Sequence, residues 1–147
     1  MKPKKLLAAL ISLCIILSAF PAFNAFAAED NPSTGSCGKN GDNVSFVYQN
    51  GTLTISGSGE MADYEKYSDN ETPYEDIKRF VKNVVVQEGV TRIGSDAFGS
   101  CYKLQSVTLP EGIVSIGDEA FSGTYSLTSI TLPQSLETLG SYAFGGS

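Results

Sequence analysis

The sequence predicts a β-rich solenoid, a fold in which short coils of chain stack on one another. An Ile/Leu-Gly…Ala-Phe signature occurs three times at a spacing of 23 residues, in 93–98, 116–121 and 139–144. A fixed period of this size is typical of repeat proteins. Apolar residues at alternate positions precede each copy, as in a short strand, and a hairpin signal precedes the first copy.

Residues 1–27 have the pattern of a secretory signal peptide. Three lysines among the first five residues precede an apolar run of 15 residues, Leu6 to Phe20, and Ala25-Phe26-Ala27 offers small residues for a signal peptidase. The run is too short to cross a bilayer core of roughly 30 Å. We therefore expect cleavage after Ala27, an extracellular bacterial protein and no transmembrane segment in the mature chain.

The charge of the mature chain excludes some classes of partner. Without the signal-peptide lysines, seven Lys and Arg residues face 16 Asp and Glu residues, a net charge of −9. Nucleic acids and anionic lipids both require a basic surface, so we expect neither as a partner. About 120 residues remain, which suffices for one small domain.

The first mature residues are predicted to form a leader and then a hairpin. Residues 28–36 are polar, include Pro32 and Gly35 and lack periodicity, which indicates a flexible leader. From Cys37 onward, apolar and polar residues alternate on both sides of Asn50-Gly51. Both residues of this dipeptide tolerate the positive φ of a type I′ turn, so a two-stranded hairpin is expected here.

Residues 37–80 are predicted to cap the solenoid. Tyr74, Ile77 and Phe80 lie three residues apart, which favours a short helix from about Thr72. The first coil of a solenoid exposes an apolar cross-section and unpaired strand edges unless something covers them. The hairpin and this helix supply such a cover.

Residues 81–147 are predicted to form three coils, Val81–Lys103, Leu104–Ser126 and Leu127–Ser147, the last incomplete. Each opens with a strand whose alternate side chains enter the core: Val84 and Val86, Val107 and Leu109, Ile130 and Leu132. One helical turn at Asp118–Phe121 follows in the second coil, with acidic residues at its start. The signature phenylalanines Phe98, Phe121 and Phe144 should stack as a structural ladder through the core.

The coil pattern resembles the BspA-like (Treponema pallidum type) leucine-rich repeat, a 23-residue class of bacterial surface proteins. The residues that carry the resemblance are Leu104, Val107, Leu109-Pro110, Ile113, Ile116-Gly117 and Ala120-Phe121, with counterparts in Leu127–Phe144. The first coil departs from the pattern, because Gln87 stands where the others have Pro. The resemblance implies an extracellular protein that binds or adheres through its stacked repeats, without catalytic or cofactor residues.

The outward side chains of the predicted strands are the candidate ligand-facing residues. They are mostly small and polar: Asn83, Val85, Ser106, Thr108, Ser129 and Thr131. Hydroxyl groups flanked by Tyr102, Lys103 and Tyr125 suit a protein or glycan ligand through adaptable hydrogen bonds. A plain solvated sheet face is the alternative, because strand alternation alone predicts polar residues there.

The sequence offers no recognisable catalytic or metal-binding motif. It contains no His, which excludes histidine-dependent acid–base and triad chemistry. Seven acidic residues lie between Glu60 and Asp76, but their spacing matches neither a calcium loop nor a catalytic carboxylate pair on a helix. We expect no cofactor and no metal, and a solvated charged surface in this segment.

Two points stay open from the sequence. Cys37 and Cys101 either form a disulfide or, as we favour, Cys101 is a small residue in a tight turn, since Thr124 and Ser147 occupy its position in the other coils. The chain stops in its third coil without a polar terminal cap, which indicates the N-terminal portion of a longer protein. The alternative to a binding protein is a non-catalytic accessory or spacer module of a larger secreted protein, such as a surface hydrolase.

Overall fold

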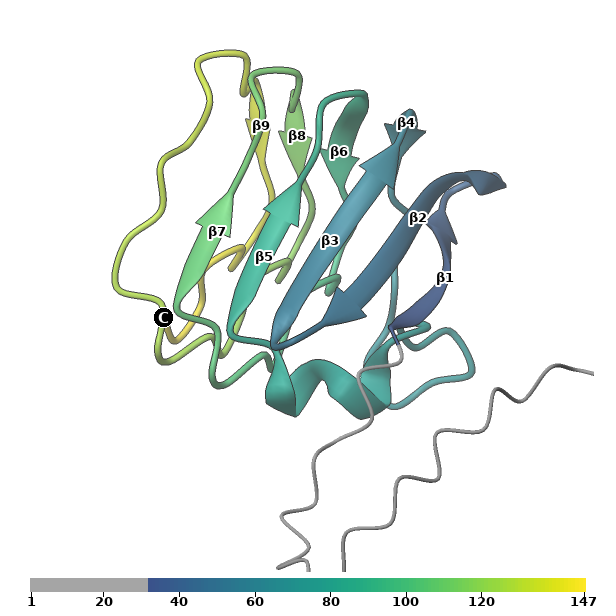
Figure 1. Ribbon diagram of the computed structural model, residues 1–147. Helices are drawn as coiled ribbons and strands as arrows, with labels where there is room; N and C mark the ends of the chain where they lie inside the picture. Colours follow the sequence, from purple (N-terminus) through teal and green to yellow (C-terminus); the bar gives the residue numbers. More distant parts are fainter. Residues whose placement is uncertain (1–31) are drawn as a thin grey trace, which may run out of the picture.

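The computed structural model describes residues 32–147, which form two sheets and one short helix (Figure 1). The predicted signal peptide and the first residues of the predicted leader lie outside the described residues. The elements are β1 (Ser33–Gly38), β2 (Gly41–Gln49), β3 (Thr52–Gly57), β4 (Gly59–Glu60), the 3₁₀ helix η1 (Glu75–Phe80), β5 (Asn83–Val86), β6 (Val90–Ile93), β7 (Ser106–Thr108), β8 (Ser115–Ile116) and β9 (Thr138–Leu139).

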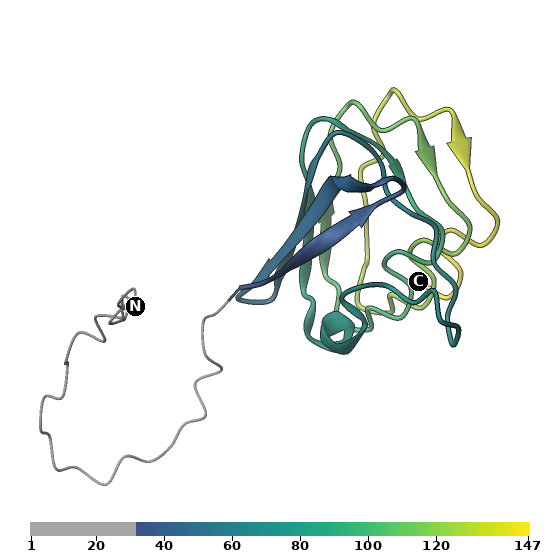
Figure 2. The ribbon, with the colours of Figure 1, turned by 90° about the vertical axis from the view of Figure 1, so that its right-hand side faces the viewer.

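From β3 to β8 the strands alternate between two sheets as the chain coils. One sheet has the order β1-β2-β3-β5-β7 and the other the order β4-β6-β8-β9. Seen from the side of β1 and β2, the strands β8 and β9 lie across the interior from the five-stranded sheet (Figure 2). The first and second coils each add one strand to each sheet, and the third adds β9 to the four-stranded sheet, which is the geometry of a repeat solenoid.

The predicted hairpin at Asn50-Gly51 is confirmed. Antiparallel β2 and β3 flank this turn, and Asn50 and Gly51 have φ values of 51° and 79°. Strand β3 then pairs in parallel with β5, with Leu53 beside Val84. The hairpin therefore extends the repeat sheet rather than forming a separate unit.

Parallel register repeats every 23 residues along the coils. Asn83 lies beside Ser106 on β5 and β7, and Ser115 lies beside Thr138 on β8 and β9. The same spacing brings the signature glycines Gly94, Gly117 and Gly140 close to the backbone of the preceding segment. Stacking therefore places equivalent side chains above one another.

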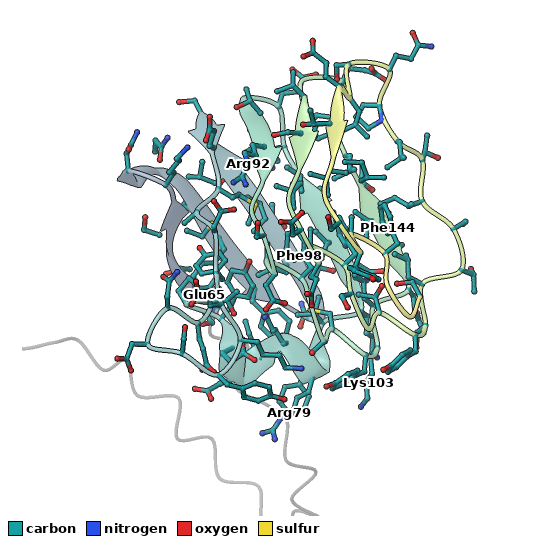
Figure 3. All side chains as sticks on the ribbon, turned by 180° about the vertical axis from the view of Figure 1, so that it is seen from behind. Glu65, Arg79, Arg92, Phe98, Lys103 and Phe144 are labelled. Carbon is teal, nitrogen blue, oxygen red and sulfur yellow. The ribbon has the colours of Figure 1, made fainter. Side chains whose placement is uncertain are left out.

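A column of aromatic rings fills the core. Phe98 and Phe121 are fully buried, and their ring centroids lie 5.2 Å apart. Phe144 stacks on Phe121 at 5.3 Å, and Tyr74 continues the column at the other end, 6.3 Å from Phe98. Figure 3 shows Phe98 and Phe144 in the interior between the two sheets.

The predicted leader ends earlier than expected. Ser33–Gly38 form strand β1, which pairs antiparallel with β2 from Ser33 opposite Tyr48 onward. The prediction of a flexible leader over 28–36 is therefore wrong for residues 33–36. Backbone hydrogen bonds to β2 hold this edge strand, so it does not need apolar side chains at alternate positions. Its polar, glycine-containing sequence therefore gives no strand signal.

The predicted short helix is present but begins later and is tighter. It is the 3₁₀ helix η1, which begins at Glu75 and not at about Thr72. Tyr74 has φ −120° and is 2% exposed, with its hydroxyl donating to the Ala97 carbonyl at 3.1 Å. Tyr74 is the residue before η1, and its φ of −120° and ψ of 26° are not helical, so the helix begins at Glu75.

The predicted helical turn at Asp118–Phe121 is wrong. Glu119 has φ 52°, outside the right-handed helical region, and Asp96 and Tyr142 repeat this conformation at 54° and 52°. The backbone amides in these turns donate to the next coil instead, as in Phe98 N to Ala120 O at 2.8 Å. Bonds between coils therefore hold these turns, together with single bonds within a turn such as Ser122 N to Glu119 O at 2.9 Å.

The third coil departs from the predicted pattern. Residues 127–133 form no strand, and in Figure 1 this segment curves away from β7. Leu132 and Leu139, expected in the core, are 40% and 52% exposed, whereas Val86 and Ile116 are buried. Among the described residues, the third coil packs on the second coil through β9 and through Phe144, which stacks on Phe121.

Candidate binding surface

The outer face of the five-stranded sheet is the candidate binding surface. Its first column joins Thr52, Asn83 and Ser106 through the parallel register. Ser106 Oγ donates to Asn83 Oδ1 at 2.8 Å, and Asn83 Nδ2 donates to Thr52 Oγ1 at 3.5 Å. These bonds align the side chains into an ordered polar row across three strands.

A second column lies beside the first. Thr54, Val85 and Thr108 are register partners, and Val47 of β2 pairs with Thr54. Val47 is 37% exposed, so the column presents methyl groups as well as hydroxyls. Hydroxyl and methyl groups side by side suit a ligand with both hydrogen-bonding and apolar surface.

The surface is uncharged although the chain is acidic. Its outward residues on β2, β3, β5 and β7 include no acid and no base: Ser45, Val47, Gln49, Thr52, Thr54, Ser56, Asn83, Val85, Ser106 and Thr108. A ligand that docks here removes no charged side chain of these strands from water, so the desolvation cost stays low.

The structure brings together four of the six candidate ligand-facing residues. Asn83, Val85, Ser106 and Thr108 lie on β5 and β7. Ser129 and Thr131 are exposed but belong to the segment that forms no strand, so they do not extend the two columns.

Sequence reasoning missed the part of the surface that β2 and β3 supply. Thr52, Thr54 and Val47 continue the two columns beyond the repeats. The period-2 alternation around the Asn50-Gly51 turn predicts that these side chains share one face. The sequence contains no signal that this face is continuous with the repeat sheet, because the parallel pairing of β3 with β5 joins residues 31 positions apart, such as Thr52 and Asn83.

The flanking aromatic residues lie at the end of the coils. Tyr102 and Tyr125 stack with centroids 5.8 Å apart and an interplanar angle of 10°. They are 47% and 70% exposed. Figure 3 places the neighbouring Lys103 at this lower end, near the side of the molecule that carries Arg79.

The acidic segment 60–76 contributes ion pairs and backbone contacts. Glu60 pairs with Lys39 at 2.7 Å, and Asp63 pairs with Arg92 at 2.6 Å. Asp63 Oδ1 also accepts from the Ser95 amide at 2.8 Å, which joins the segment to the first coil. Residues 32–147 contain no group of three or more His, Cys, Asp or Glu side chains placed to hold a metal ion.

Acid should weaken the junction that Asp63 makes. Partial burial acts to raise the pKa of Asp63, but the Ser95 amide and Arg92 outweigh it, and the pKa is lowered. Because the pKa of Asp63 is lower in the folded chain than in the unfolded chain, the ionised carboxylate stabilises the fold at pH values above the unfolded-state pKa, near 4. This stabilisation is lost as the pH falls through the folded-state pKa. Asp63→Asn should cost about 1 kcal/mol at pH 7, a modest loss because the carboxylate is half exposed.

Chemical denaturation at pH 7 and at pH 2–3 checks this expectation. The difference in stability between Asp63→Asn and the unmodified chain should shrink on acidification. Asp69→Asn, in an exposed position of the same segment, is the control. A difference that stays constant over this range would contradict a role for the Asp63 charge.

The two cysteines are buried and are not bonded to each other. Cys37 is 3% exposed and Cys101 is fully buried. Burial raises the pKa of both thiols to about 12, so neither is a thiolate at neutral pH. Their role in this structure is packing, which agrees with the interpretation of Cys101 as a small residue in a turn.

Comparison with known proteins identifies the repeats. Residues 75–147 match the family model described as "BspA type Leucine rich repeat region (6 copies)". No curated protein matches the sequence. Among the described residues, no helix combines the length and the apolar character that crossing a bilayer requires.

Solved leucine-rich repeat proteins resemble the fold. One from Eubacterium ventriosum is 34% identical over 78% of this chain, with a TM-score of 0.67. Others come from Bacteroides ovatus (28% identity, 71% of this chain, TM-score 0.48) and T. pallidum (26%, 63%, TM-score 0.46). The chain spans only 30%, 32% and 48% of the lengths of these three proteins.

Proposed function

Because residues 75–147 belong to the BspA-type leucine-rich repeat family, we propose that this chain is part of a secreted or cell-surface bacterial protein that binds an extracellular protein or glycan. The ligand lies on the outer face of the five-stranded sheet. The role is one of binding or adhesion and not of catalysis, and the signal peptide over residues 1–27 directs export.

The observation that carries this proposal is the ordered, uncharged row of side chains across β3, β5 and β7. Thr52, Asn83 and Ser106 are joined by hydrogen bonds and so are held in position before a ligand arrives. Preorganised side chains lose little conformational entropy on binding, which favours affinity.

We also propose that the repeating unit is a coil of 23 residues and that an N-terminal cap covers the first coil. Residues 33–80 cover the first coil, because β3 pairs with β5, β4 pairs with β6, and Tyr74 lies on Phe98. The cap also enlarges the binding face, since β2 and β3 add Val47, Thr52 and Thr54 to the columns of the repeats.

Arginine substitutions on the face should abolish binding without unfolding the protein. In Thr54→Arg with Thr108→Arg, two long cationic side chains stand on either side of Val85 and block a flat ligand. We expect affinity for a matrix protein or neutral glycan found on a binding panel to fall at least tenfold, measured by biolayer interferometry.

Thr138→Arg is the matched control, because Thr138 is exposed on β9 of the opposite sheet. It should leave affinity unchanged, and all variants should keep the melting temperature within a few degrees. Equal affinity of the double variant and the unmodified protein would move the ligand away from this face.

A further inference from the structure

A hollow at the end of the coils lies apart from the strand face. It has a volume of about 300 Å³, and its lining includes Lys66, Tyr67, Asp76, Arg79, Ser100 and Tyr102. These residues come from the loop before η1, from η1 and from the end of the first coil. Figure 3 shows the Arg79 side chain at this end of the molecule. The volume suits a small ligand.

Two cations in the hollow keep their charge available. Lys66 Nζ donates to Ser100 Oγ at 2.8 Å and lies 4.9 Å from the centre of the Tyr67 ring. The Arg79 guanidinium lies over the Phe80 ring at 4.7 Å. Within residues 32–147, the ion pairs of the structure involve Lys39, Lys78 and Arg92, and neither Lys66 nor Arg79.

Lys66 is cationic at neutral pH. Partial burial acts to lower the pKa of Lys66, but its hydrogen bond with Tyr67 and the nearby Tyr102 and Asp96 outweigh burial, and the pKa is raised. The Lys66 amide also donates to Asp96 Oδ2 at 3.1 Å, which fixes the backbone of the loop against the first coil.

The remaining ionic groups of the hollow leave one net positive charge. Lys78 is 5% exposed and pairs with Glu75 at 2.9 Å, so these two lining residues neutralise each other. Among the lining residues, Asp76 is then the one acid opposite Lys66 and Arg79, and Asp96, which accepts from the Lys66 amide, lies beside the lining. A single carboxylate matches this balance, whereas a densely phosphorylated or sulfated ligand would meet repulsion from Asp76 and Asp96.

Aromatic rings and oxygen acceptors complete the recognition chemistry. Tyr67 is 85% exposed and Tyr102 is 47% exposed, and Tyr125 supports the Tyr102 ring by stacking on it. A sugar ring offers an apolar face to such rings and hydroxyl groups to carboxylates such as Asp76.

We propose that the hollow binds the terminal residue of an acidic saccharide, a sugar that carries one carboxylate. Lys66 and Arg79 bind the carboxylate, Tyr67 and Tyr102 contact the ring, and Asp76 accepts from its hydroxyls. This inference goes beyond the proposed function, because it assigns a second ligand to a surface outside the strand face.

Ligand-observed NMR with three probes tests the proposal on the purified protein. D-glucuronate and N-acetylneuraminate carry the carboxylate, and D-glucose does not. We expect at least one acidic sugar to bind tenfold or more tightly than glucose, and which of the two does so identifies the source. Equal affinity for all three sugars, or no binding of either acid, overturns the proposal.

Substitutions separate this site from the strand face. Lys66→Gln and Tyr102→Ala change exposed side chains, and each should weaken binding of the acidic sugar at least tenfold. Lys82→Gln, an exposed cation outside the hollow, is the matched control and should change affinity less than twofold. Thr54→Arg with Thr108→Arg should also leave sugar binding intact. A Lys66→Gln protein that binds as tightly as the unmodified one overturns the assignment.

Discussion

Replacing Phe121 by alanine should lower the free energy of unfolding by about 3–5 kcal/mol. Phe121 is fully buried and stacks on Phe98 on one side and on Phe144 on the other. Its removal leaves a cavity in the middle of the column that rigid neighbouring coils cannot close. Thermal unfolding followed by circular dichroism should show a melting temperature lower by on the order of 15 °C.

Two further substitutions make this test specific for the column. Phe144→Ala should cost less, because Phe144 is only partly buried and stacks on one neighbour. Tyr142→Ala removes an aromatic ring that is 79% exposed and should change stability by less than about 0.5 kcal/mol. An unchanged melting temperature for Phe121→Ala would contradict the stacked core.

The repeat geometry could be predicted because equivalent residues of the first and second coils have the same surroundings. Phe98 and Phe121 occupy equivalent positions and are equally buried, and Asn50-Gly51 forms the hairpin turn that its backbone preferences favour. A phenylalanine side chain favours a buried position, and Asn-Gly favours a turn with positive φ, so in both cases the residue type alone indicates the structure.

Other features depend on neighbours that a local pattern does not contain. Strand β1 is held by backbone bonds to β2, so its residues need no apolar alternation. Leu132 has the right residue type for the core, yet it is 40% exposed, because residues 127–133 form no strand beside β7. Glu119 takes a left-handed conformation because its amide bonds to Ser141 of the next coil.

The candidate surfaces were predictable to different degrees. Asn83 and Ser106 follow from strand alternation and the 23-residue period. The contribution of Thr52 depends on a parallel pairing across 31 positions, and the hollow beside Lys66 depends on how a loop without periodicity folds against η1. Neither long-range contact has a periodic signal in the sequence.

Gly94→Ala should destabilise the junction between the cap and the first coil by about 3 kcal/mol, at the upper end of overpacking effects. A Cβ atom at Gly94 would overlap the carbonyl oxygen of Ala62. The oxygen belongs to the backbone, and the Cβ atom is bonded directly to it at Cα. Side-chain rotation therefore cannot relieve the clash, and the two segments must move apart. Urea denaturation should show a lower midpoint.

Gly112→Ala is the matched control for this substitution. A Cβ atom at Gly112 would lie 3.8 Å from its nearest neighbour, the Val90 carbonyl oxygen, which is ordinary van der Waals contact. Gly112→Ala should therefore leave stability unchanged or raise it by about 0.5 kcal/mol through the unfolded chain. Since both substitutions add one methyl group, a difference between them isolates the close approach of coils at Gly94. Equal midpoints for the two variants would show that residues 59–64 do not pack on the first coil, and residues 33–80 would then not act as its cap.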